Sequence, residues 1–225
     1  MMSKEVHMNP TPRTKSISAN SYTYPYLGIK KELTRPSKPN HINFFKVIEE
    51  RRSNKDLLPL EENQLDFLLW YSSRTRVAYL DEDYILSKRP SPSAGAVHPI
   101  DILINHAGDN FFSIYSPFEH GVYRLDFLEE KVQSFIKHIS LAFPGRKGTL
   151  LWFIIHQYRT DKYYKNSESL GWRDAGALMQ TIALTCSALG IGCCPVGTLG
   201  EPYIYELHNN FEGISSGGGI IIGNT

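Results

Sequence analysis

The chain has few cysteines, and this scarcity excludes two kinds of cross-linked scaffold. Only Cys186, Cys193 and Cys194 occur among its 225 residues. Three clustered thiols are too few for a disulfide framework, and no pair of CxxC motifs completes a zinc site. We therefore expect no metal centre and a reducing compartment.

The chain also lacks a long hydrophobic run and a net charge. Its longest apolar stretch, Leu150–Ile155, is far too short to cross a bilayer, and residues 1–20 contain no run of signal-peptide length. Lys and Arg number 24 against 23 Asp and Glu, which leaves a formal charge of +1. This balance predicts no overall attraction to nucleic acid or to an anionic membrane. We expect a cytoplasmic protein in which any anion site is local.

What the chain does contain is the composition of a folded domain. Hydrophobic residues make up 41% and charged residues 21%, which is enough apolar material for a core. The length favours one domain with an appendage. Residues 1–40 are rich in Pro, Ser, Thr, Asn and Lys and predict an N-terminal arm, in which Tyr22–Leu27 could lie as an extended strap. Residues 41–225 predict the folded domain.

Hydrophobic spacing predicts a mixture of helices and strands. Apolar residues at helical intervals predict helices over 40–50, 61–71, 128–139 and 174–189. Asn40 is expected to cap the first of them. Short β-branched and aromatic runs predict strands over 100–105, 111–115, 122–127, 150–158 and 220–222. These elements do not alternate regularly, which favours an α+β layer fold over a doubly wound sheet.

A basic segment follows the first predicted helix. Residues 51–55 hold three cations and a hydroxyl, which could converge on a phosphate group. A helix C-terminus repels anions, so side chains rather than the helix dipole would have to bind that phosphate. The candidate residues are Arg51, Arg52, Ser53 and Lys55. The alternative is that they only complement the dipole.

Two loops are rich in small residues. The first would let its backbone approach a flat ligand closely, while its prolines fix the path; its candidate residues are Pro92, Ser93, Ala94, Gly95 and Ala96. In the same loop, His98 could be a ligand, a base or a structural hydrogen-bonding group. The second loop, 190–197, ends in Pro195, Val196 and Gly197. It has no Walker lysine and does not follow a predicted strand, which excludes both nucleotide-binding fingerprints. Each loop could also be an ordinary turn.

A lysine precedes a tyrosine after the predicted strand 150–158. Lys162 could stabilise the phenolate of Tyr163 and make it a proton acceptor near neutral pH, provided that both face one pocket. Adjacent strand residues point to opposite faces, so this arrangement needs a turn at 162–163. The alternative is a solvated loop of basic and aromatic residues.

Taken in this order, the four segments resemble those of the nitroreductase-like FMN flavoprotein superfamily, and within it the SagB-type azoline dehydrogenase branch. Residues 51–55 are similar to the flavin phosphate and ribityl motif, and 92–99 to the loop that passes the isoalloxazine. Residues 194–197 resemble the turn that covers one face of the flavin ring. Lys162–Tyr163 falls where the branch carries its catalytic pair, and Asp174–Gly176 follows at the spacing of that branch.

The resemblance implies a cofactor, a fold and a reaction. It implies bound FMN and a nitroreductase-like α+β fold, in which helices flank a central, mainly antiparallel sheet. It also implies an intertwined homodimer whose two flavin sites are each built from both subunits. The implied reaction is oxidation of thiazoline or oxazoline rings to thiazoles or oxazoles in a peptide natural product, with Lys162 and Tyr163 as catalytic residues.

Two other functions are compatible with the same residues. One is an NAD(P)H-dependent nitro or quinone reductase, which needs an open slot above the flavin and no dedicated base. The other is a flavin-free scaffold subunit that holds a cyclodehydratase or carrier partner in a biosynthetic complex, with the N-terminal arm as its docking strap.

Overall fold

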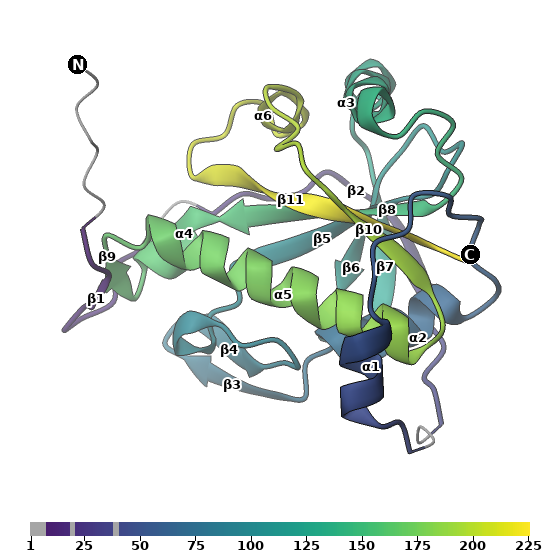
Figure 1. The fold of residues 1–225 in the computed structure, drawn as a ribbon. Helices are drawn as coiled ribbons and strands as arrows, with labels where there is room; N and C mark the ends of the chain where they lie inside the picture. Colours follow the sequence, from purple (N-terminus) through teal and green to yellow (C-terminus); the bar gives the residue numbers. More distant parts are fainter. Residues whose placement is uncertain (1–7, 19–20, 38–40) are drawn as a thin grey trace, which may run out of the picture.

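A seven-stranded antiparallel sheet forms the centre of the fold, as Figure 1 shows. The computed structural model describes residues 8–18, 21–37 and 41–225. The strands lie in the order β10-β11-β8-β5-β6-β7-β2, and neighbouring strands pair antiparallel. Their bounds are Tyr26–Glu32 for β2, Ile100–Asn105 for β5, Ser113–Ser116 for β6, Gly121–Leu125 for β7, Thr149–His156 for β8, Gly192–Val196 for β10 and Ile214–Gly223 for β11.

Helices cover both faces of this sheet. The long α5 (Glu168–Ala188) crosses one face, together with α1 (Phe44–Glu50) and α2 (Gln64–Ser73). The shorter α6 (Tyr203–Leu207) and α3 (Glu129–Ala142) lie on the other face (Figure 1). The expected α+β fold, with helices flanking a mainly antiparallel sheet, is therefore confirmed.

The central strand β8 separates two hydrophobic cores. All eight of its residues are buried. Leu151, Phe153 and Ile155 pack on the α5 side, whereas Leu150, Trp152 and Ile154 pack against α3 and α6. A strand covered on both faces needs apolar side chains at every position, which explains the continuous hydrophobic run in the sequence.

Smaller elements surround the N-terminal end of α5. The short helix α4 (Gln157–Asp161) follows β8 directly, and the hairpin β3–β4 (Val77–Asp81 and Tyr84–Lys88) lies beside α5. Two residues of the arm form β1 (Thr11–Pro12), which pairs with β9 (Tyr164–Lys165). A single turn of 3-10 helix (Ala94–Ala96) lies in the first small-residue loop.

Several boundaries differ from the sequence predictions. Helix α5 begins at Glu168 rather than 174, because Leu170 and Gly171 are buried and tertiary packing extends the helix beyond its apolar periodicity. Helix α2 begins at Gln64 rather than 61, after Asn63 in the left-handed conformation (φ 65°). The predicted cap Asn40 lies outside the described residues.

The boundaries of two strands also differ from the sequence predictions. Residues 157–158, expected in a strand, belong to α4. Strand β11 begins six residues before the predicted 220, because a bulge between Ser216 and Gly219 carries the glycines through the sheet. A Cβ atom at Gly219 would lie 2.5 Å from Cε3 of Trp152, so this approach requires glycine. The predictions omitted β2, β10, α6 and the β3–β4 hairpin.

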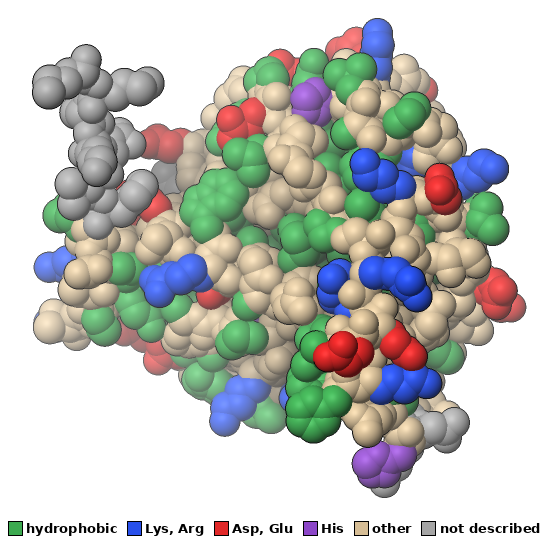
Figure 2. All heavy atoms as spheres, viewed as in Figure 1, with side chains coloured by type: hydrophobic (Ala, Val, Ile, Leu, Met, Phe, Trp, Pro, Cys, Tyr) green, Lys and Arg blue, Asp and Glu red, His purple; other side chains and the backbone are tan. Residues whose placement is uncertain are grey.

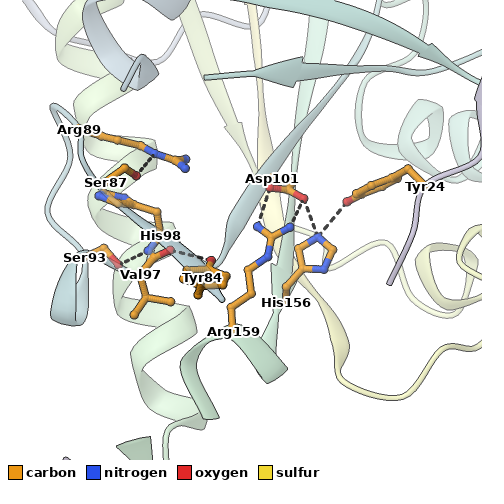
Figure 3. Close-up of polar contacts among 10 residues, drawn as sticks. All are labelled: Tyr24, Tyr84, Ser87, Arg89, Ser93, Val97, His98, Asp101, His156 and Arg159. Carbon is orange, nitrogen blue, oxygen red and sulfur yellow. Dashed lines mark hydrogen bonds and ion pairs between the residues drawn. The ribbon is translucent and has the colours of Figure 1, made fainter. Parts of the chain in front are cut away.

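A buried charged network ties α4 to the sheet (Figure 3). Arg159 donates from Nη1 and Nη2 to the two carboxylate oxygens of Asp101, at 2.7 and 2.8 Å. His156 Nε2 lies 2.8 Å from the same carboxylate, and the Tyr24 hydroxyl lies 2.9 Å from Nε2. Burial alone would raise the pKa of Asp101, but Arg159 and His156 hold it well below the usual value.

Buried histidines make the fold sensitive to acid. Burial lowers the pKa of His98 to about 3 and that of His208 to about 4, from 6.5. The unfolded chain therefore binds more protons below about pH 6.5, and stability falls as the pH falls through that range. At pH 5 each of these histidines should cost about 2 kcal/mol of unfolding free energy.

We expect His208→Gln to weaken this pH dependence. Urea unfolding at about pH 7.5 and about pH 5 should show a stability difference about 2 kcal/mol smaller in the variant than in the parent chain. Glutamine does not titrate, so it removes one proton-binding group from the unfolded state. Equal pH dependence in both proteins would contradict the neutral, buried state of His208.

Candidate active site

The predicted phosphate-binding segment ends α1 and joins the edge of the sheet. Arg51 is the C-cap of α1, and Ser53 forms an isolated parallel bridge with Cys193 on β10. The Asn54 amide donates to the Cys193 carbonyl at 2.8 Å. These contacts set the segment against the loop 190–193, which precedes and begins β10.

A cavity of about 440 Å³ lies at this junction. Arg51, Arg52 and Asn54 line it from one side and Gly190–Cys193 from the other. Figure 2 shows basic side chains gathered at the C-terminal end of α1, beside acidic ones. Among the described residues, neither arginine forms an ion pair within 4.0 Å. Lys55 lies apart, at a second cavity of about 430 Å³.

The cysteines are buried and unbridged. Cys186 and Cys193 lie together where α5 meets β10. A hydrogen bond from Cys186 lowers the pKa of Cys193, and Arg51 nearby acts in the same direction. In the described part of the chain, His, Cys, Asp and Glu form no cluster of three that could hold a metal ion. The same residues include no helix long and apolar enough to cross a membrane.

The first small-residue loop is fastened to the N-terminal half of α5. The Ser93 hydroxyl donates to Asp174 at 2.5 Å and accepts from the His98 amide at 2.9 Å. Burial raises the pKa of Asp174. Gly95 has φ 61°, and a Cβ atom there would lie 2.9 Å from the Tyr164 hydroxyl. The loop is thus held between α5 and the segment that contains the lysine–tyrosine pair.

His98 has a structural role in this loop (Figure 3). It lies in a narrow pocket of about 20 Å³ together with Arg89 and Asp174. Burial, with the charge of Arg89 close by, lowers the pKa of His98 to about 3. A histidine with so low a pKa stays neutral and is a weak base near neutral pH. Burial also lowers the pKa of Arg89 to about 10.

Lys162 and Tyr163 lie in a turn directly after α4, so the turn that a shared pocket would need is present. Lys162 is 8% exposed, donates to Asp83 and lies 3.9 Å from a carboxylate oxygen of Glu82. The hydrogen bond from Lys162 lowers the pKa of Asp83. The lysine charge is therefore matched by carboxylates of the β3–β4 turn.

Tyr163 has a protonated phenol in this arrangement. Its hydroxyl is buried and makes no hydrogen bond to the described residues within the usual limits of length and angle. Burial and the nearby Asp81 carboxylate raise the pKa of Tyr163. Its ring packs edge-on against Tyr84, with 6.1 Å between the centroids, and Lys162 Nζ lies 5.9 Å from the centre of the Tyr163 ring.

The predicted residues form two groups at different positions along α5. At one position, the Ser187 hydroxyl donates to the Val47 carbonyl of α1, close to the arginine segment. At the other, Asp174 holds the loop 92–96. Thirteen helical residues separate these anchors, a rise of about 20 Å. Pro195 and Val196 are the last two residues of β10, and Gly197 follows them, so this part of the predicted turn is a strand. A single chain therefore joins Lys162–Tyr163 to loop 92–96 but not to Arg51 and Arg52.

Sequence reasoning missed the residues that surround the lysine–tyrosine pair. Asp81, Glu82 and Asp83 come from a hairpin about 80 positions earlier, and Tyr164 reaches Gly95. No local motif marks these contacts. A β-branched and aromatic run on both sides of Glu82 could have indicated the hairpin.

Comparison with known proteins identifies the family. The model of the nitroreductase family matches residues 48–214, which is most of the chain. No curated protein matches this sequence.

Solved structures share the fold at low sequence identity. The candidate nitroreductase of Ralstonia eutropha JMP134 is 19% identical, with 94% of this chain and 97% of that chain covered and a TM-score of 0.66. A chain of the Escherichia coli microcin synthetase McbBCD complex with truncated pro-MccB17 bound is 17% identical, with 87% of this chain and 78% of that chain covered and a TM-score of 0.58. The FMN-dependent nitroreductase of Clostridium difficile R20291 is 15% identical, with 80% of this chain and 87% of that chain covered and a TM-score of 0.50.

The family model and the shared sheet and helix arrangement agree. The chain therefore belongs to the nitroreductase family, a family of oxidoreductases.

Proposed function

We propose that this protein is an FMN-dependent dehydrogenase that oxidises a thiazoline or oxazoline ring of a peptide to the aromatic azole. The observation that carries the proposal is that Lys162 and Tyr163 lie between the β3–β4 turn and the loop that the Ser93–Asp174 hydrogen bond holds against α5. The similarity of the fold to a chain of the microcin synthetase complex, which holds a truncated pro-peptide, supports a peptide substrate. A cyclodehydratase or carrier protein is the corresponding partner.

The residues present fit an FMN phosphate. Arg51 and Arg52 line a cavity without ion-pair partners in the described chain, so both guanidinium groups are available to a dianion. Backbone of the glycine-containing loop 190–193 forms the opposite wall. We assign Ser53 to the same cofactor and Pro195, Val196 and Gly197 to one face of its ring. Lys55 would join this site only if its side chain turned from the second cavity towards the phosphate. When bound, FMN would supply the hydride acceptor.

We further propose that two copies of the chain build each site. Loop 92–96 lies about 20 Å along α5 from the arginine segment, so Pro92, Ser93, Ala94, Gly95 and Ala96 would come from the partner. Helix α1 exposes apolar side chains next to the arginines, with Phe44 at 58% and Phe45 at 76%. Only Val47 of this helix is buried. A free apolar helix face of this kind is typical of an interface.

Tyr163 and Lys162 would handle the proton of the reaction. Conversion of an azoline to an azole removes a hydride and a proton from neighbouring ring carbons. Tyr163 would take the proton, and Lys162 would stabilise the resulting charge. With the raised pKa of Tyr163, this requires the Lys162 ammonium to turn from Asp83 towards the phenol.

We expect Lys162→Ala and Tyr163→Phe each to abolish azole formation while FMN stays bound. Mass spectrometry of an azoline-bearing peptide should show the loss of two hydrogens with the parent protein and at least a hundredfold slower loss with either variant. Lys165→Ala, at an exposed lysine in the same segment, is the matched control and should keep the parent rate. Retained dehydrogenation in both site variants would remove this mechanism.

The phosphate assignment has a separate test. Arg51→Ala combined with Arg52→Ala should give a colourless protein, because two charge-assisted phosphate contacts are lost. Absorbance near the flavin band relative to protein absorbance measures the bound FMN. Arg124→Ala, at an arginine that stacks on Phe111 away from the cavity, should keep the cofactor. A fully flavinated double variant would refute the assignment.

The interface has a third test. Phe45→Glu should convert a dimer into monomers and release FMN, because a buried carboxylate disrupts an apolar contact. Light scattering gives the mass in solution. Leu141→Glu is the matched control, since Leu141 is 80% exposed on α3, across the sheet from α1. A monomeric Phe45→Glu variant that keeps its flavin would show that one chain suffices.

A second function, NAD(P)H-dependent reduction of nitro or quinone compounds, is favoured by the pairing of Lys162 with Asp83. This reaction needs no base at Tyr163, and a charge-matched lysine is consistent with that. Rapid bleaching of the flavin by NADH, followed by turnover of a nitroaromatic that is insensitive to Tyr163→Phe, would support it over azoline oxidation.

A further inference from the structure

The N-terminal arm runs along the backbone of the lysine–tyrosine turn. Thr11 and Pro12 pair with Lys165 and Tyr164 as a short antiparallel sheet. The chain then continues past the turn, and Figure 1 shows this part of the arm next to β9 and the start of α5. The arm therefore contacts the segment that we assign to catalysis.

Three consecutive carbonyl groups of that segment accept hydrogen bonds from the arm. The Arg13 amide donates to the Tyr163 carbonyl at 2.8 Å, and Arg13 Nε donates to the Asp161 carbonyl at 2.7 Å. The Ile17 amide donates to the Lys162 carbonyl at 3.2 Å. Arg13 thus holds the carbonyls on both sides of Lys162.

The arm also reaches the charges around Lys162. The Ser16 hydroxyl donates to Glu82, and a carboxylate oxygen of Glu82 lies 3.9 Å from Lys162 Nζ. One short stretch of the arm therefore contacts both the backbone of the turn and a carboxylate that faces its lysine.

Hydrophobic burial does not explain this docking. None of the residues 8–18 is buried, and Arg13 and Ser16 are among the few that are partly covered. Within the helix and turn, the Lys162 and Tyr163 amides bond to Tyr158 and Thr160. Those bonds orient the amides, whereas the three carbonyls are oriented by the arm.

We propose that residues 9–17 form a clamp that holds the Lys162–Tyr163 turn in place, and that Arg13 is its positioning residue. The inference rests on the proposed roles of Lys162 and Tyr163. The clamp works mainly through backbone groups. The amides of Arg13 and Ile17 hold two carbonyls of the turn, and the Arg13 side chain holds the carbonyl of Asp161.

Arg13→Ala should lower kcat for azoline oxidation by about tenfold to a hundredfold with little change in KM or FMN content, because small displacements of a reacting group cost rate rather than binding. Arg13→Lys, which keeps a donor of similar reach, should recover part of the loss. Lys15→Ala, at an exposed lysine in the same stretch, is the matched control. Deletion of residues 1–18 should reproduce or exceed the Arg13→Ala effect.

A second measurement does not depend on the reaction. 3-Fluorotyrosine placed at position 163 of the FMN-bound protein reports the surroundings of the phenol by fluorine NMR. Arg13→Ala and the deletion should shift the resonance and lower the pKa of the phenol towards its usual value, because a loosened turn exposes the phenol to water and removes the effect of burial. The groups around the phenol are Asp81, Glu82, Asp83, Tyr84 and Lys162. Lys15→Ala should leave the spectrum unchanged.

The two measurements separate the possible failures. An unchanged resonance and an unchanged kcat in both Arg13→Ala and the deletion would overturn the clamp. If the parent protein does not oxidise azolines, the proposed function fails, and the resonance still decides the clamp: a shift in both variants supports it and no shift overturns it.

Discussion

The position of the candidate site depends on the Asp101–Arg159 ion pair. Asp101 lies on β5 and Arg159 on α4, so their two hydrogen bonds fasten a helix of five residues to the central sheet. A helix that short has little stability of its own. Because both charges are largely shielded from water, with side chains 17% and 18% exposed, removal of either partner would leave the other uncompensated and would destabilise the fold. Lys162 follows this anchored helix directly, so the ion pair sets the start of the Lys162–Tyr163 turn.

Helix α5 sets a second constraint, because it keeps α1 and loop 92–96 apart along its length. Its C-terminal half packs against α1 and its N-terminal half holds Ser93 through Asp174. A straight helix cannot bring these two ends together. In the dimer that we propose, the two groups of residues on one chain would belong to two different sites, and the exposed apolar side chains of α1 would face the second copy.

Much of the fold, and part of the candidate site, could be predicted from the sequence. Strand β8 and the body of α5 have strong hydrophobic patterns, and a turn at 162–163 is the condition under which Lys162 and Tyr163 can share a pocket. What escaped prediction depends on contacts between distant residues. The carboxylates around Lys162 come from the β3–β4 hairpin, and the Arg13 contacts use backbone carbonyls, which carry no sequence signature. The glycines of β11 resemble a strand break in sequence, although the bulge lets them continue the sheet.

The three adjacent acids of the β3–β4 turn have an effect that extends beyond their ion pair. Glu82 and Asp83 lie beside Lys162, and Asp81 lies near the Tyr163 phenol, so three carboxylates of one turn are available to interact with positive charge here. Because Glu82 and Asp83 are exposed, added salt weakens their attraction for Lys162.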